Sequence, residues 1–580
     1  MKTIWTFFLF VTVNLTLHSQ LLPENIFADT ANAPFLHGVT SGDPTPSAVI
    51  IWTRIESDQL ETVEWQLSKL PDFSTIEQNG FFETGSIRDW TVKVDVNGLL
   101  PSTTYYYRFK SDDGLYSVTG RTRTAPIGDL YQARIAVMSC SSIYSGFFNA
   151  YKRMAEREDL DLIIHVGDYV YDFVDADEEV RVPMPYPFDP ITLEQWRERH
   201  RYYLLDPDLR EARRIHPWIA LWDNHDIDWA AGEETAPIQA FLEYLPIRLP
   251  EPTNPNRIYR KLAYGDLIDI FVTDVLMYKG LDTIDGTHPS MIGNEQYNWL
   301  TNELSNSTAK WKLLPMQNLM AGWSVQNVPS FVGIGTNGVL DPSNWDGYDT
   351  DRDRVLNYIK DNNVDNVVVL SGDSHVTIVA DLTTDPQNTS VYNGNTGEGS
   401  VAVEFLPTSI SRGNFDEMGF GWAIGIVTPI MAAENPNHVR ANFTDHGYGL
   451  LDVKADSCVA EIWYSDKMTI TNQENFAGGF VVKDGVNHWN RTPTSTPTDA
   501  KDWQNLQVKT TEIPVFQLFP NPASKELTIK GVSVNTAKNF KIYSNEGKEV
   551  KNPNLISSQV EQITLQIPAI PSGNYFITFD

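Results

Sequence analysis

Four short segments of the sequence place metal-binding side chains directly after runs of apolar residues. Each apolar run is predicted to be a buried strand, and the carboxyl ends of parallel strands meet at one edge of a sheet. We therefore expect the four segments to form one site. They are Ser139-Cys140-Ser141-Ser142, Gly167-Asp168-Tyr169-Val170-Tyr171, Asp223-Asn224-His225-Asp226 and Gly372-Asp373-Ser374-His375.

The side chains in these segments suit cations of different kinds. A carboxylate has two oxygens and can bridge two cations, which is the role we expect for Asp168. The thiolate of Cys140 and the phenolate of Tyr171 are strong donors that suit trivalent iron. The amide oxygen of Asn224 suits a harder divalent ion such as calcium. A further carboxylate and an imidazole come from Asp373 and His375.

Such a donor set indicates hydrolysis of phosphoric esters. Two cations about 3.5 to 4 Å apart hold a phosphate oxygen and activate a water or hydroxide for in-line attack. The leaving oxygen needs a proton donor, and His225, beside Asn224, can reach a substrate. We predict catalytic roles for His225, Asn224 and Asp168.

Taken singly, none of these segments is specific. Asp168 alone could be an acid in a turn, and Asn-His-Asp after a strand is often a helix cap. The occurrence of all four in order, each after a predicted strand, favours a shared site. His165 differs because it lies within its strand, and we expect it to be a buried structural group or a group that contacts a ligand, not a ligand itself.

Changes in composition divide the chain into regions. Strand-like runs between turn clusters predict a β-sandwich of immunoglobulin or fibronectin III type at 34–126. From 131 to 490, strand and helix patterns alternate, which predicts a layered α/β domain with a substantial parallel component. A Pro-, Ser- and Thr-rich linker is expected at 491–512, followed by a small β-sandwich at 513–580.

The N-terminus and the charge indicate an exported protein that does not bind nucleic acid. Lys2, an apolar run and small polar residues predict a signal peptide at 1–19, and the run is too short to span a bilayer. The net charge of -31 opposes binding to nucleic acid. It does not oppose a small phosphate ester, because bound cations can reverse the local field.

The chain has two cysteines, Cys140 and Cys458. Cys140 follows a strand, where a metal ligand is expected, and Cys458 lies in the strand-like run CVAEIWY, where a small buried side chain is expected. A disulfide between them is the alternative in an exported protein.

The order of the motifs resembles that of the calcineurin-like metallophosphoesterases, with GDxx[DY], GN-H-[DE] and GHxH. Tyr171 at the last position of GDxxY, in place of aspartate, looks like purple acid phosphatases. Cys140, together with GDxH in place of GHxH, looks more specifically like PhoD-type alkaline phosphatases. The resemblance covers most of the chain. Further similar blocks are Phe35–Pro44, Ile51–Arg54, Trp345–Tyr348 with Arg352 and Arg354, and Val403–Phe405 leading to Ser409.

The resemblance implies a metallophosphoesterase β-sandwich flanked by helices and a dinuclear or trinuclear iron–calcium site. The implied activity is hydrolysis of phosphomonoesters and phosphodiesters outside the cytoplasm. Asp223-Asn224 stands where the family often has two aspartates, so Asp223 is a candidate further ligand. The implied ligands of one iron(III) are Cys140, Asp168, Tyr171 and His375, and those of one or two calcium ions are Asp168, Asn224 and Asp373.

One departure from the family concerns phosphate binding. Family members often have Asp-x-Arg after the strand predicted at 268–272, but this chain has Asp274-Val275-Leu276. Arg197 or Arg201 is a candidate to bind phosphate instead, unless these arginines belong to a solvated helix face.

The segment from Phe519 to Phe576 resembles the type A sorting domain of type IX secretion systems. This implies that secretion machinery is a partner and that the protein is released from the cell or tethered to its surface. Two alternatives to a phosphatase are a phospholipase D-like phosphodiesterase and a non-catalytic surface-binding protein on the same fold.

Overall fold

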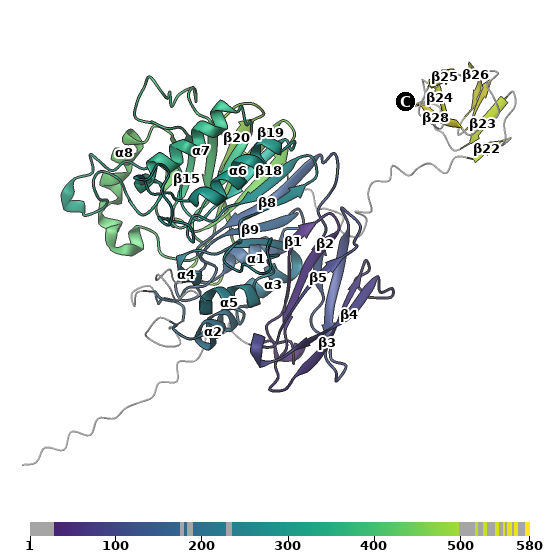
Figure 1. Ribbon diagram of the computed structural model, residues 1–580, viewed down its shortest axis with the longest axis horizontal. Helices are drawn as coiled ribbons and strands as arrows, with labels where there is room; N and C mark the ends of the chain where they lie inside the picture. Colours follow the sequence, from purple (N-terminus) through teal and green to yellow (C-terminus); the bar gives the residue numbers. More distant parts are fainter. Residues whose placement is uncertain are drawn as a thin grey trace, which may run out of the picture. The chain divides into compact units, whose positions relative to one another are not determined.

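The computed structural model describes residues 28–174, 179–182, 190–227 and 235–497, and the strands between 517 and 579 (Figure 1). The chain forms two compact units, Met1–Trp503 and Gln504–Asp580. The predicted signal peptide at 1–19 lies outside the described residues, and so does the predicted linker at 491–512 beyond residue 497.

A ten-stranded sheet forms one layer of the first unit. Its central pairs β8–β9, β9–β10 and β10–β1 are parallel, and the outer pairs are antiparallel. In spatial order the strands are β21 (Asn490–Thr492), β20 (Asn475–Lys483), β19 (Ser457–Tyr464), β18 (Gly447–Lys454), β8 (Gln132–Met138), β9 (Leu162–Val166), β10 (Pro217–Leu221), β1 (Val39–Thr45), β2 (Ala48–Arg54) and β5 (Thr91–Asn97).

A seven-stranded sheet forms the facing layer. The run from β12 to β16 is parallel, so both sheets contain the predicted parallel component. The order is β11 (Arg260–Tyr264), β12 (Ile268–Val272), β13 (Trp311–Pro315), β14 (Val367–Leu370), β16 (Ala402–Leu406), β15 (Thr377–Leu382) and β17 (His438–Asn442).

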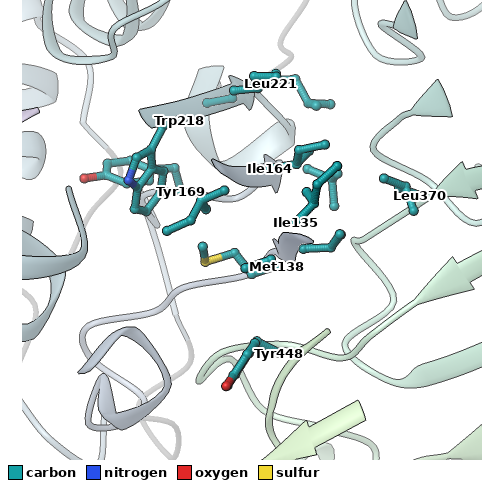
Figure 2. Close-up of a cluster of buried hydrophobic side chains, with 14 of the residues drawn as sticks. Ile135, Met138, Ile164, Tyr169, Trp218, Leu221, Leu370 and Tyr448 are labelled. Atoms are coloured by element: carbon teal, nitrogen blue, oxygen red, sulfur yellow. The ribbon is translucent and has the colours of Figure 1, made fainter. Parts of the chain in front are cut away.

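The main hydrophobic core lies between these two sheets. Ile135, Ile164 and Leu221 of the first sheet and Leu370 of the second belong to one buried cluster (Figure 2). Strands that are apolar on both faces are typical of sheets covered by other layers. The described helices are α1 (Asn149–Glu156), α2 (Leu193–Tyr203), α3 (Pro207–Ile215), α4 (Asn224–Ile227), α5 (Thr235–Tyr244), α6 (Gly293–Asn306), α7 (Asp349–Asp361) and α8 (Ile424–Glu434).

Helices cover the outer faces of the two sheets. Met154 of α1 and Leu209 of α3 pack in the cluster of the first sheet. Leu304 of α6 and Leu356 of α7 pack in a second cluster with the outward side chains of β13 and β14. The predicted α/β layered fold, a β-sandwich flanked by helices, is therefore confirmed.

The N-terminal β-module is not a separate body. One of its sheets is β4 (Gln78–Thr84), β3 (Glu61–Ser68), β6 (Thr104–Lys110) and β7 (Gly120–Arg123). Its other strands continue the ten-stranded sheet, because Ser41 and Gly42 of β1 pair with Pro217 and Trp218 of β10. A Cβ on Gly42 would lie 2.6 Å from the Trp218 carbonyl oxygen, so only glycine fits this crossing.

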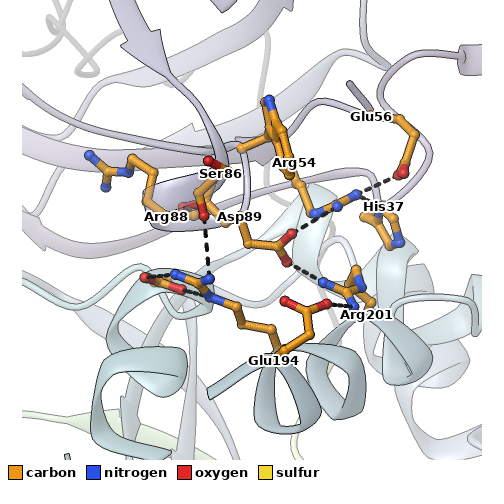
Figure 3. A network of polar contacts seen from close by, with 12 residues as sticks. His37, Arg54, Glu56, Ser86, Arg88, Asp89, Glu194 and Arg201 are labelled. Carbon is orange, nitrogen blue, oxygen red and sulfur yellow. Dashed lines mark hydrogen bonds and ion pairs between the residues drawn. The ribbon is translucent and has the colours of Figure 1, made fainter. Parts of the chain in front are cut away.

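The suggestion that Arg197 or Arg201 binds phosphate is wrong, and so is the alternative of a solvated helix face. Arg201 of α2 pairs with Asp89 of the N-terminal module at 2.6 Å (Figure 3). Arg197 is buried and pairs with Glu243 of α5 at 2.7 Å. These guanidinium groups hold α2 against its neighbours.

The C-terminal unit contains two small sheets, as expected of the predicted β-sandwich. They are antiparallel, with strand orders β22-β23-β27-β26 and β25-β24-β28. The strands are β22 (Gln517–Phe519), β23 (Glu526–Lys530), β24 (Phe540–Ser544), β25 (Glu549–Lys551), β26 (Asn554–Gln559), β27 (Gln562–Gln566) and β28 (Tyr575–Phe579).

Candidate metal centre

The predicted ligands stand at the carboxyl ends of parallel strands in both sheets. Cys140, Asp168 and Asp223 follow the neighbouring strands β8, β9 and β10, and Asp373 and His375 follow β14 of the facing sheet. Cys140, Asp168, Asp373 and His375 all have positive φ, between 56° and 65°. Non-glycine residues in this left-handed region cost about 1–3 kcal/mol each and cluster at functional sites.

Four of these side chains converge. The ligand atoms of Cys140, Asp168 and His375 all lie within 4.8 Å of one another. The Tyr171 hydroxyl donates to Asp168 Oδ2 at 2.8 Å and lies 3.2 Å from His375 Nε2. This group unites a thiol, a carboxyl, a phenol and an imidazole from three loops.

The imidazole of His375 has the orientation and the protonation state of a metal ligand. Its Nδ1 lies 3.0 Å from the carbonyl oxygen of Gly413, so Nδ1–H donates there and Nε2 turns a lone pair to Tyr171 and Asp168. Burial and the nearby His225 lower the pKa of His375 to about 3, which keeps the ring neutral. Neutral imidazole is the form that binds a cation.

Asp223 and Asp373 extend this group with further carboxylates. Asp223 Oδ1 accepts from Asn224 N–H at 2.9 Å, whereas Oδ2 is buried with no hydrogen-bond partner among the described residues. Asp373 Oδ2 accepts from Asn344 Nδ2 at 3.4 Å. An orphaned buried carboxylate oxygen fits a cation, because burying an unpaired charge is otherwise costly.

Asn224 is more exposed than the other predicted ligands. It is the first residue of α4, and it is exposed. It therefore stands at the mouth of the site, beside the buried Asp223.

The loops after β9 and β10 can lie close together only because residue 167 is glycine. Its φ is +112°, and a Cβ built there would lie 2.7 Å from the Cβ of Asp223. Any other residue would push the two ligand-bearing loops apart.

The electrostatics of the site call for positive charge. Burial and the Asp168 carboxylate raise the pKa of Asp223, and they raise that of Asp373 to about 6. The same two causes raise the pKa of the Cys140 thiol and the Tyr171 phenol. Bound cations would reverse these shifts and stabilise all four ionised forms. The donor set, which combines a thiol, a phenol, an imidazole and carboxylates, thus fits cations.

His225 lies at the mouth with its ring 4.2 Å from that of Tyr171, and 24% of its side chain is exposed. Its Nδ1 lies 2.6 Å from Asp172 Oδ1. Although burial lowers the pKa of His225, the Asp168 and Asp172 carboxylates raise it to about 9.

Asp226 is a functional residue that the sequence reasoning missed. Its Oδ2 accepts from Tyr169 N–H at 3.1 Å and Asp223 N–H at 2.9 Å, and its Oδ1 accepts from Val170 N–H at 2.9 Å. One carboxylate therefore ties the loop after β9 to the loop after β10. The one sequence feature that pointed to Asp226 was its position in the Asp223–Asp226 segment.

Two cations near the site were also missed. The guanidinium carbon of Arg412 lies 5.4 Å from the centroid of the Tyr171 ring. Lys279 lies near enough to lower the pKa of both Asp223 and Asp373, and its Nζ donates to the Ser343 carbonyl at 3.3 Å. No motif marks either cation in the sequence.

Lys279 follows β12, on the segment where the family often has the arginine of Asp-x-Arg. Asp274 on that segment is structural. Its Oδ2 accepts from Trp222 Nε1 and its Oδ1 from the Leu276 N–H, both at 3.0 Å.

The two cysteines are both free thiols, so they form no disulfide. Cys458 is buried in β19 between Val453 of β18 and Val482 of β20. It is the small core residue that its strand-like surroundings predicted.

Comparison with known proteins identifies the class. A family model described as PhoD-like phosphatase matches residues 135–462, and one described as PhoD-like phosphatase, N-terminal domain, matches 21–126. Alkaline phosphatase D of Bacillus subtilis is 32% identical over 475 residues, which cover 73% of this chain and 78% of that protein. A solved structure titled "Structure of PhoD" superposes with a TM-score of 0.70 and 28% identity, covering 80% of this chain and 93% of the other.

The fold and these similarities define a hydrolase that acts on phosphoric esters. The chain belongs to the PhoD-like phosphatase family, as its motifs indicated.

Residues 517–580 match a model described as Secretion system C-terminal sorting domain, which supports an interaction with secretion machinery. Among the described residues, no helix combines the length and hydropathy needed to span a membrane.

Proposed function

We propose that this chain is an exported phosphomonoesterase and phosphodiesterase with a mixed iron–calcium centre. The observation that carries the proposal is the convergence of the Cys140, Asp168 and His375 ligand atoms within 4.8 Å, with the Tyr171 hydroxyl hydrogen-bonded to Asp168. Iron(III) would be held by Cys140, Asp168, Tyr171 and His375, and one or two calcium ions by Asp168, Asp223, Asn224 and Asp373.

The cations would hold a phosphate oxygen and supply a nucleophilic water at neutral pH. The other residues of the mouth act on the substrate. Arg412, which lies on the Tyr171 ring, and Lys279, which lies near Asp223 and Asp373, would bind the negative charge of the phosphate. His225 would give a proton to the leaving oxygen. Asp172 occupies its Nδ1 and so directs Nε2 to the substrate.

A colour test addresses the iron site without relying on turnover. Tyrosinate bound to iron(III) absorbs visible light, so the purified holoenzyme should be coloured and Tyr171→Phe should remove the band. Tyr169→Phe is the matched control, because Tyr169 is equally buried but its hydroxyl bonds to Arg213 at 2.5 Å. A colourless, iron-free and fully active enzyme would show that Tyr171 and Cys140 do not bind iron.

The activity itself is tested with p-nitrophenyl phosphate and bis(p-nitrophenyl) phosphate side by side. We expect turnover of at least one ester, its stimulation by calcium and its loss in Asp168→Asn. If wild-type enzyme that contains iron and calcium hydrolyses neither ester, the proposed function is wrong.

We further propose that the C-terminal unit is a type IX export address and that the protein acts outside the cell after removal of the predicted signal peptide at 1–19. The matched sorting domain supports this route. Mass spectrometry of protein recovered from the medium or the cell surface would locate both ends of the mature chain. Recovery from the cytoplasm alone would contradict the proposal.

A further inference from the structure

Two stretches of the first unit carry no charged residue and no histidine. They are 321–340 and 418–433, in a chain of which 21% is charged. The second stretch includes most of α8, in which only Val427 and Met431 are buried, so the rest of an apolar helix faces outward. Figure 1 shows α8 at the periphery of the first unit, on the side away from β3 and β4.

These stretches expose large apolar side chains together. Phe331 is 69% exposed and Trp422 60%, and their rings stack with centroids 6.3 Å apart. Met418 and Ile426 are 47% and 40% exposed. Single exposed apolar residues are ordinary, but a contiguous apolar surface marks a site of interaction. We call the surface formed by Phe331, Met418, Trp422 and Ile426 the apolar rim.

The two stretches are fixed to one another. Ser324 N–H donates to Asn435 Oδ1 at 2.7 Å, and Asn327 N–H donates to Glu434 at the end of α8. Trp323 stacks on Phe415 with ring centroids 6.1 Å apart. The two stretches are therefore held together by these contacts and form one surface.

Residues next to each stretch also contact side chains of the metal centre. Just past 321–340, Asn344 donates to Asp373 Oδ2 at 3.4 Å. Just before 418–433, Gly413 accepts from His375 Nδ1, and Arg412 lies on the Tyr171 ring. The rim is therefore joined to the metal centre by short segments of the chain that contact Asp373, His375 and Tyr171.

We propose that the apolar rim docks on an uncharged lipid–water interface, such as the surface of a phosphatidylcholine bilayer, and presents phosphate esters of amphipathic molecules to the centre. Exposed Trp, Phe and Met suit the boundary between headgroups and acyl chains. An uncharged rim on a chain of net charge -31 suits a zwitterionic surface, because an anionic one would repel the protein. The choice of substrate rests on the proposed function, whereas the docking does not.

Docking is measured by flotation of the holoenzyme with phosphatidylcholine vesicles. We expect binding that weakens when anionic phosphatidylglycerol is added. The double variant Phe331→Ser, Trp422→Ser should bind at least about tenfold more weakly, since each change removes a large apolar side chain from the interface. Phe81→Ser is the matched control, because Phe81 is 70% exposed on β4 of the N-terminal module.

Three results would overturn the docking: wild type that does not float, a double variant that floats like wild type, and a wild-type dimer that dissociates in the double variant. The last would show that a second copy covers the rim. For catalysis, the double variant should lose hydrolysis of a vesicle-embedded ester out of proportion to bis(p-nitrophenyl) phosphate. If wild type floats but cleaves no soluble ester, the proposed function fails while the docking stands.

Discussion

The Asp226 carboxylate provides the sharpest test of how the site is held together. It accepts three backbone N–H groups, two from the loop after β9 and one from the loop after β10. The residue is fully buried. Asp226→Ala would leave all three donors without an acceptor.

The size of the effect follows from these bonds. A buried donor left unsatisfied costs roughly 1–3 kcal/mol. The sum is partly offset, because burial and the Asp168 carboxylate raise the pKa of Asp226 to about 8, and the substitution relieves that repulsion. We expect a loss of about 4 kcal/mol in the free energy of unfolding for Asp226→Ala. Asp226→Asn keeps one acceptor oxygen and should lose about 2 kcal/mol.

The assay is denaturant unfolding of the metal-loaded proteins, paired with metal content and turnover of bis(p-nitrophenyl) phosphate. Asp72→Ala is the control, because Asp72 also accepts a backbone N–H, from Ser74 at 3.0 Å, but in an exposed turn. It should leave the unfolding midpoint unchanged. An Asp226→Ala protein as stable as Asp72→Ala, with full metal content, would refute the reasoning.

Three further predictions concern other parts of the first unit. Gly167→Ala, whose new Cβ would lie 2.7 Å from the Cβ of the aspartate after β10, should lower the metal content measured by elemental analysis, while Gly128→Ala, in open space, should not. Burial lowers the pKa of His438 to about 4, so its contribution to stability is complete above pH 6.5 and is lost as the pH falls from 6.5 to 4. The difference in unfolding free energy between wild type and His438→Gln should therefore shrink by about 3 kcal/mol over that range, and a constant difference would contradict this. Lys467→Met removes a buried ammonium group that donates to the Ser411 carbonyl at 2.8 Å and so holds the loop 409–414. We expect kcat/KM for the diester to fall. A change in thermal midpoint alone would show that the role of Lys467 is purely structural.

The sequence predicted the parts of the site that are local. Cys140, Asp168, Asp223 and Asp373 each follow an apolar run, and the rule that parallel strand ends share an edge is enough to bring them together. The layered fold followed from the same alternation of strands and helices.

The parts that were missed depend on contacts between distant segments. The role of Asp226 becomes visible only when the loop after β9 lies against it. Arg197 and Arg201 were misassigned because an arginine-rich helix has the same pattern whether it faces phosphate, water or buried carboxylates. Lys279 stands apart from any motif, so only the fold shows that it lies near Asp223 and Asp373.

The parallel pairing of β1 with β10 bears on the order in which the chain can fold. When β1 leaves the ribosome it can pair at once with β2, its hairpin neighbour, but its other edge stays open until β10 has been made. Such long-range parallel pairing closes a large loop and is slow to form. The N-terminal module is thus completed only together with the strands that carry the metal ligands. A fragment that ends before β10 would expose an unpaired edge and invite aggregation.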